Sequence, residues 1–83
     1  MYYVYLLECA DKTFYCGYTV DIEKRLDHHN NSKLGAKYTS GRRPVALVYS
    51  EVFQTLSEAL KREYQIKKMD RKAKKFLAKS MIV

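Results

Sequence analysis

Three segments of the chain have the hydrophobic pattern of β-strands. Residues 2–9 are almost continuously apolar and rich in β-branched and aromatic side chains, which is typical of a strand covered on both faces. A short polar turn separates them from a second segment of this kind, residues 13–19, so the two predict a β-hairpin. Pro44 introduces a third strand over residues 45–53, because proline is tolerated at the first residue of a strand.

The remaining apolar positions recur at helical spacing. A first helix is predicted over about residues 21–31, with Thr19 or Asp21 as its N-cap. A capping box that begins at Thr55 opens a second helix, which runs to about Met69.

Asp70 is the predicted N-cap of a last helix over residues 71–80. Its inward face is expected to hold Ala73, Phe76, Leu77 and Met81. The order β-β-α-β-α-α predicts an α+β fold, in which a small three-stranded antiparallel sheet is flanked by helices. Because three strands alone cannot bury a core, at least one helix must cover the sheet.

Length and composition fit one compact domain over residues 1–83. Apolar residues make up 47% of the 83, which is enough for a core and too many for a disordered chain. No apolar run approaches the ~20 residues of a membrane span, and the N-terminus lacks the basic flank of a signal peptide. We therefore expect a cytoplasmic protein with no membrane partner, in which Cys9 and Cys16 are small core residues rather than a disulfide or a zinc site.

The net charge of +7 is unevenly distributed. Residues 1–60 are electrically neutral, whereas residues 61–79 hold nine basic side chains and two acidic ones. This asymmetry favours a polyanionic partner, either nucleic acid or an acidic membrane surface. The second is disfavoured, because the apolar residues of the basic segment are needed to close a small core.

Glu63 is the most informative single residue, since it falls within the apolar stripe of the second predicted helix. The other members of that stripe are Leu56, Ala59, Leu60 and Ile66. A carboxylate in such a position must be paired, hydrogen-bonded or bound to a metal. The pattern leaves two readings open: an ion pair, for which Arg25 is a candidate, and a metal ligand.

Arg25 and His29 are four residues apart on the apolar face of the first predicted helix. Arginine suits bidentate contact with phosphate, although a side chain that only passes the edge of the core would give the same pattern. Gly17 interrupts a strand, which often marks a bulge or the close approach of a ligand.

The segment between the first helix and the third strand has no acidic residue. Its basic, hydroxyl and aromatic side chains suit a phosphate backbone and an unstacked base, or form a merely solvated loop. The candidate contacts there are Lys33, Lys37, Tyr38, Arg42 and Arg43.

Taken in order, these residues resemble the GIY-YIG nuclease domain. The resemblance rests on Tyr3-Val4-Tyr5, on Tyr15-Cys16-Gly17, on Arg25 and on Glu63, and it covers nearly the whole chain. The chain is most similar to small stand-alone bacterial members, which are related to the catalytic half of a structure-specific nuclease. Two departures stand out: Tyr3 replaces the glycine of the first motif, and Cys16 replaces the isoleucine or valine of the second. Neither removes a catalytic group.

The resemblance implies a role for each of these side chains. Tyr5 would be the general base or would orient the attacking water, Tyr15 would contact the scissile phosphate, and Arg25 would stabilise its developing charge. His29 would bind phosphate or assist proton transfer. Glu63 would be the single protein ligand of one divalent ion, Mg²⁺ or Mn²⁺, which changes the preferred reading of this residue from ion pair to metal ligand.

The implied function is metal-dependent endonuclease cleavage of DNA, with branched, nicked or single-stranded structures as candidate substrates. The expected nucleic-acid contacts are Gly17, Lys33, Lys37, Tyr38, Arg42, Arg43, Lys67 and Lys68. Arg25 or the metal is expected to lower the pKa of Tyr5. Because no separate DNA-binding domain is attached, specificity would come from this domain, a protein partner or a homodimer. The alternative is a nucleic-acid-binding module that retains the fold without catalysis.

Overall fold

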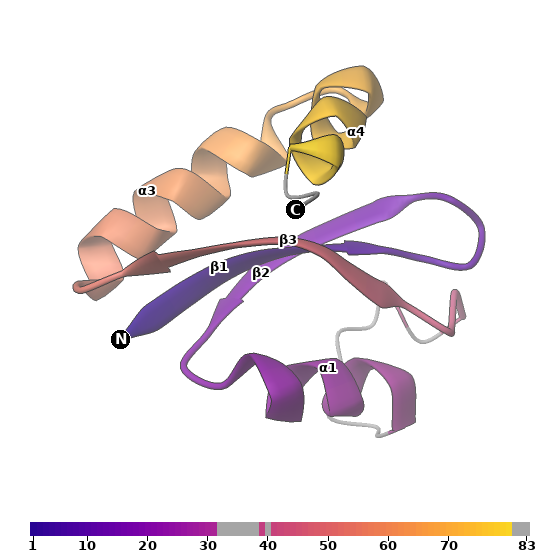
Figure 1. The fold of residues 1–83 in the computed structure, drawn as a ribbon, viewed down its shortest axis with the longest axis horizontal. Helices are drawn as coiled ribbons and strands as arrows, with labels where there is room; N and C mark the ends of the chain where they lie inside the picture. The colour runs from indigo at the N-terminus through magenta and orange to yellow at the C-terminus, as the bar shows by residue number, and fades with distance from the viewer. Residues whose placement is uncertain (32–38, 40, 81–83) are drawn as a thin grey trace.

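The computed structural model describes residues 1–31, 39 and 41–80. Within them, three strands form one antiparallel sheet in the order β2-β1-β3 (Figure 1). The strands are β1 (Tyr2–Glu8), β2 (Phe14–Thr19) and β3 (Ala46–Phe53). Lys33, Lys37, Tyr38 and Met81, which were named above as candidates, lie outside the described residues.

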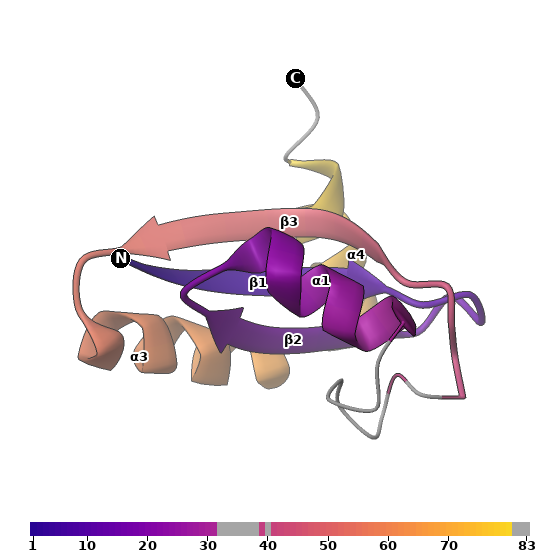
Figure 2. The same cartoon turned by 90° about the horizontal axis from the view of Figure 1, so that it is seen from below.

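The described helices cover both faces of the sheet. Helix α1 (Ile22–Asn31) lies on one face, and helices α3 (Leu56–Lys67) and α4 (Arg71–Lys79) lie on the other (Figures 1 and 2). The predicted α+β fold and the element order β-β-α-β-α-α are therefore confirmed.

Strand β1 supplies side chains to two separate clusters because it is the central strand. Val4 and Leu6 pack toward α3, in a cluster that contains Cys16, Ala59 and Ile66. The intervening residues point the other way, and that cluster consists of Tyr5, Leu7, Cys9 and Val45. The prediction of a strand buried on both faces is confirmed, and both cysteines are buried free thiols.

The helices begin where the sequence predicts. The Asp21 carboxylate accepts the Lys24 backbone N–H at 3.1 Å, so Asp21 rather than Thr19 caps α1. Thr55 and Asp70 cap α3 and α4 in the same way. Each cap satisfies a backbone donor that has no partner within the helix.

Two predictions about which residues are buried are wrong. Leu56 and Leu60 are 38% and 40% exposed, and Phe76 is 77% exposed. Helix α3 instead faces the sheet with Ala59 and Ile66, while Arg62 on its flank donates to Glu51 of β3 at 3.0 Å. That ion pair and the small Ala59 fix the rotation of the helix and turn the two leucines outward.

Candidate active site

Tyr5 lies at the centre of the sheet face that α1 covers, and it is 3% exposed. Its partner across the hairpin is Gly17. A Cβ atom on Gly17 would lie 2.5 Å from the Tyr5 hydroxyl oxygen and 2.8 Å from Cζ. The space left by this glycine is therefore filled by the Tyr5 ring, which explains a glycine within a strand without invoking a substrate.

Arg25 and His29 project from α1 onto the Tyr5 hydroxyl. Arg25 Nε donates to the hydroxyl oxygen at 3.3 Å, and that oxygen lies 2.9 Å from His29 Nε2. Because a guanidinium can only donate, the hydroxyl accepts from Arg25, and its own proton is available to His29 Nε2 when that nitrogen is the acceptor.

Thr39 contacts the other nitrogen of the same imidazole, with its hydroxyl oxygen 2.8 Å from His29 Nδ1. Both residues are fully buried. When Nε2 accepts, the neutral ring carries its proton on Nδ1 and donates it to Thr39. No sequence signal marked Thr39 as a partner of His29, since a threonine in a basic loop has no distinguishing pattern.

Burial sets the charge state of this chain of hydrogen bonds. It raises the pKa of Tyr5 to about 12, although the hydrogen bond and charge of Arg25 act in the opposite direction. Arg25 lowers the pKa of Tyr5 as expected, but burial outweighs it, so the net shift is upward. Burial, together with the charges of Arg25 and Arg43, lowers the pKa of His29 to about 4. At neutral pH, Tyr5 is a phenol and His29 is a neutral acceptor.

Tyr15 completes the cluster from β2. Its ring centroid lies 5.1 Å from that of His29 and 6.4 Å from that of Tyr5. Tyr15 is only partly buried. The structure thus brings together four side chains that the sequence had singled out: Tyr5, Tyr15, Arg25 and His29.

Glu63 lies on the other face of the sheet, on α3 behind β2. Its backbone carbonyl accepts a weak hydrogen bond from the Cys16 thiol, with 3.9 Å between sulfur and oxygen. Within the described residues its carboxylate forms one ion pair, with Lys67 at 3.6 Å. The alternative of an ion pair with Arg25 is therefore wrong.

Comparison with known families settles the relationship of the chain. The GIY-YIG catalytic domain matches residues 1–76. The chain belongs to the GIY-YIG family. This is a nuclease family, so its catalytic domain implies a hydrolase that acts on nucleic acid.

Similar GIY-YIG proteins are known from bacteria and archaea. A UPF0213 protein from Syntrophus aciditrophicus (strain SB) is 62% identical over 77 residues, covering 93% of this chain and 88% of that protein. UPF0213 protein VNG_2274C from Halobacterium salinarum is 49% identical over 77 residues, covering 93% of this chain and 99% of that protein. The solution structure of protein EF2693 from E. faecalis has a TM-score of 0.65 at 48% identity, covering 95% of this chain and 83% of that one.

The two arginines of the predicted nucleic-acid loop have partners within the GIY-YIG domain itself. Arg42 forms an ion pair with Asp11 at 3.0 Å. Arg43 Nε donates to the backbone carbonyl of His29 at 2.5 Å, at the end of α1. Both contacts join the residues just before β3 to the rest of the domain, and binding of nucleic acid by Arg42 and Arg43 remains a prediction.

Glu63 is the only carboxylate among the predicted site residues. In residues 1–31, 39 and 41–80, no three His, Cys, Asp or Glu side chains converge on one point. A lone carboxylate fits a hard divalent cation such as Mg²⁺, which keeps several of its waters. In the same residues, no helix has the length and apolarity that a membrane span requires.

Proposed function

We propose that this protein is a metal-dependent endonuclease that hydrolyses phosphodiester bonds in DNA. The observation that carries the proposal is the hydrogen-bonded chain from Arg25 through Tyr5 and His29 to Thr39, with Tyr15 packed beside it. A nuclease needs a cation for the phosphate and a proton acceptor for the attacking water, and this chain supplies both.

Tyr5 and His29 act as a proton relay. As water attacks phosphorus, Tyr5 takes the water proton while its own proton passes to His29 Nε2, 2.9 Å away. The relay avoids a free phenolate, which the Tyr5 pKa of about 12 would make rare at neutral pH. A phosphate on Arg25 would offset one of the positive charges that lower the His29 pKa, making the imidazole a better acceptor.

Arg25 and Tyr15 bind the scissile phosphate. The guanidinium stabilises the charge that develops on the phosphate oxygens, and the Tyr15 hydroxyl orients the group. Attack by water breaks the bond between phosphorus and the 3′ oxygen, which takes up a proton from solvent. The products are a 5′-phosphate and a 3′-hydroxyl, as in related nucleases.

Glu63 holds the divalent ion, Mg²⁺ or Mn²⁺. Its side chain is 15% exposed, and its carboxylate forms one long ion pair among the described residues, with Lys67, so a cation could displace that lysine. When bound, such an ion supplies Lewis-acid polarisation of a phosphate oxygen. In the described sheet β2 pairs with β1 alone, so β2 has a free edge. A phosphodiester along this free edge of β2 would have Tyr15 on one side and Glu63 on the other.

The proposal extends to the setting of the reaction. The catalytic unit spans residues 1–83, acts in the cytoplasm, and contacts DNA through Lys67, Lys68 and the basic loop. Branched, nicked and single-stranded DNA are the candidate substrates, and a protein partner or a homodimer would add specificity.

Cleavage of a panel of labelled duplex, nicked, flapped and single-stranded DNAs, with Mg²⁺ or with chelator, tests the function. We expect wild type to cleave at least one substrate only with metal, and Glu63→Gln to lower the rate at least about 100-fold. Glu23→Gln is the matched control, because Glu23 is an exposed carboxylate on α1. Absence of metal-dependent cleavage across the panel would refute the proposal, as would normal cleavage by Glu63→Gln.

The second candidate is a binding module without turnover. The uneven charge of residues 61–79 favours it as well, since that charge alone would bind a polyanion. Strongly salt-dependent DNA binding that is indifferent to chelator and to Glu63→Gln, without any cleavage, would identify this function.

A further inference from the structure

The exposed face of α4 carries a row of cations, Arg71, Lys72, Lys75 and Lys79, called the α4 ridge below. Helix α4 contains no acidic residue, and the carboxylate of its cap, Asp70, accepts the Ala73 backbone N–H at 2.8 Å. The ion pairs between described residues are Arg42–Asp11, Arg62–Glu51 and Lys67–Glu63, and none includes the ridge.

This arrangement is unfavourable for the helix taken alone. Arg71, Lys75 and Lys79 follow one another at intervals of four residues, where like charges repel across each helical turn. Phe76 lies beside them on the same short helix with 77% of its surface exposed. A bound polyanion would relieve the repulsion and cover the aromatic ring.

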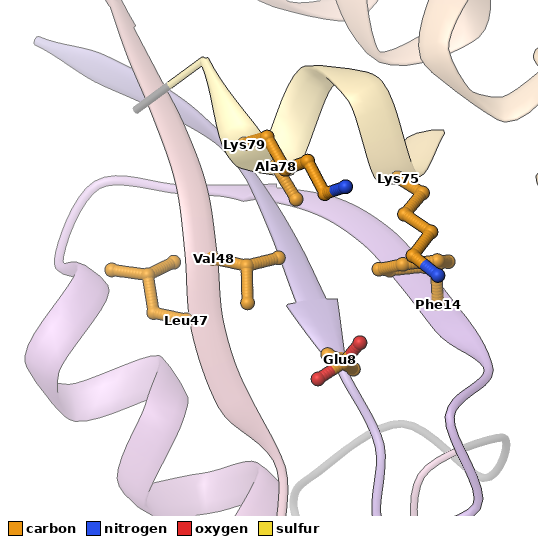
Figure 3. Close-up of a pocket in the computed structure, with 7 residues that line it drawn as sticks. All are labelled: Glu8, Phe14, Leu47, Val48, Lys75, Ala78 and Lys79. Atoms are coloured by element: carbon orange, nitrogen blue, oxygen red, sulfur yellow. The ribbon is translucent and has the colours of Figure 1, made fainter. Parts of the chain in front are cut away.

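Two open hollows flank the α4 ridge. One, of about 440 Å³, lies between α4 and the sheet and is lined by Glu8, Phe14, Leu47, Val48, Lys75, Ala78 and Lys79 (Figure 3). The other, of about 510 Å³, is lined by Met69, Asp70, Lys72, Ala73, Phe76 and Leu77. The cations therefore stand between two largely apolar surfaces, each of which presents an aromatic ring and one carboxylate, Glu8 in the first and Asp70 in the second.

We propose that the α4 ridge binds a single-stranded segment of nucleic acid, with its phosphates on the cations and its unstacked bases against Phe76 and in the hollow beside Phe14. Basic grooves with interleaved aromatic rings bind single strands, because every base has a face that can stack. A duplex keeps its bases stacked inside and could use only the cations. The ridge thus selects single-stranded over duplex nucleic acid.

A membrane surface fits the same helix less well. Ala73, Leu77 and Ala78 are half-buried against the body of the domain, and within α4 Phe76 is the one large apolar side chain that is exposed. Peripheral membrane helices instead present a continuous apolar face. Charge and a single stackable ring favour nucleic acid.

The position of the ridge bears on the substrate of the proposed nuclease, and this step rests on that proposed function. Helix α4 lies on the face of the sheet opposite α1 (Figure 1). Tyr5, Tyr15, Arg25 and His29 lie on the α1 face. The described molecule measures 30 × 26 × 25 Å. A DNA with a single-stranded arm beside the cleavage point can contact both faces, so flapped or branched DNA is the class of substrate that the ridge favours.

Fluorescence anisotropy of the full chain with a labelled oligothymidylate and with a hairpin duplex, both in chelator, tests the inference without any cleavage. We expect wild type to bind the single strand more tightly, and Phe76→Ala to lower that affinity roughly 5- to 100-fold while Phe76→Trp retains it. Lys75→Gln with Lys79→Gln should reduce the slope of log affinity against log salt by about 1.4. All of these side chains are exposed, and circular dichroism checks that each variant folds.

Matched controls separate the ridge from general charge and aromatic content. Tyr64→Ala removes an aromatic side chain that is 60% exposed on α3, and Lys12→Gln with Lys61→Gln removes the same two charges elsewhere. The inference is overturned if these controls weaken single-strand binding as much as the ridge variants do, or if Phe76→Ala has no effect. The inference is also overturned if the ridge variants lose binding to anionic phospholipid vesicles but still bind the oligonucleotide. That result would assign the ridge to membranes.

The outcome is independent of the nuclease proposal. Selective loss of single-strand binding in a protein that cleaves no DNA would leave the ridge as a binding surface and reject the nuclease. Metal-dependent cleavage with normal single-strand binding in every ridge variant would support the nuclease and reject the ridge as a binding surface.

Discussion

At the scale of single residues, the site depends on how closely Tyr5 fits its surroundings. Its ring occupies the space above Gly17, and its hydroxyl is held between Arg25 and His29. A small displacement of the ring would break both hydrogen bonds. The chemistry of the site therefore depends on glycine at position 17 as well as on the side chains of Tyr5, Arg25 and His29.

Gly17→Ala should destabilise the fold and impair cleavage. The added methyl group would lie 2.5 Å from the Tyr5 hydroxyl oxygen and must displace a buried, hydrogen-bonded ring, at a cost of about 1–3 kcal/mol. Urea unfolding and cleavage assays measure the two effects. Gly41→Ala is the matched control, because nothing lies within 4 Å of its added Cβ. Equal stability of the two variants would mean that Tyr5 does not need the space above Gly17.

His29 should make stability depend on pH. Its pKa in the folded state, about 4, lies below the ordinary value of 6.5, so as pH falls the unfolded state takes up the proton first. The contribution of neutral His29 to the free energy of unfolding is fully present above pH 6.5. It is lost as pH falls toward 4, by roughly 3 kcal/mol in all.

Urea unfolding of wild type and His29→Gln at pH 7 and pH 4 isolates this contribution, because glutamine can accept the Tyr5 hydrogen bond without titrating. Wild type should lose more stability than the variant between the two pH values. An identical loss in both proteins would show that His29 is not held neutral by the fold.

At the scale of elements, the end of α1 is tied to the start of β3. The Asn30 side chain donates to the Val45 carbonyl at 3.0 Å and accepts the Val45 N–H at 2.7 Å. Arg43 adds the hydrogen bond to the His29 carbonyl. These contacts hold α1, and with it Arg25 and His29, against the sheet.

Asn30→Ala should therefore lower the free energy of unfolding more than Asn31→Ala does. It leaves the backbone groups of buried Val45 without these partners, which costs about 1–3 kcal/mol. Asn31→Ala removes only an exposed hydrogen bond to Asp27 and should cost less than about 0.5 kcal/mol. Chemical denaturation compares the two, and similar losses would argue against this tie between α1 and β3.

At the scale of the whole molecule, the tyrosine cluster proposed for cleavage and the α4 ridge proposed for capture lie on opposite faces of one sheet, and Glu63 would serve cleavage from the α3 face. The tyrosine cluster lies between the sheet and α1, whereas the excess positive charge lies on α3 and α4. Screening by salt should act mainly on the charged face, because its cations are exposed.

Steady-state kinetics on a flapped DNA should separate the two faces. Lys75→Gln with Lys79→Gln is expected to raise KM roughly 3- to 10-fold with kcat unchanged, since the pair binds ground and transition states alike. Arg25→Lys should instead lower kcat, because lysine cannot reproduce the planar contact with phosphate. A fall in kcat for the lysine pair would contradict this division.

The sequence by itself determined the elements and most members of the site. Strand alternation, N-caps and helical spacing are local properties of the chain, so the order β-β-α-β-α-α could be predicted. The same local logic placed Arg25 and His29 on one helical face. The family relationship followed from those residues in their order.

The tertiary structure alone decided the rest. Thr39 became a partner of His29, and Leu60 and Phe76 turned outward, because helix rotation and loop position depend on how all the layers pack together. The net direction of the Tyr5 pKa shift could not be predicted either, since the sequence shows the nearby cation but not the burial that outweighs it. Periodicity encodes the local backbone, whereas burial and long-range contacts exist only once the sheet and its helices are assembled.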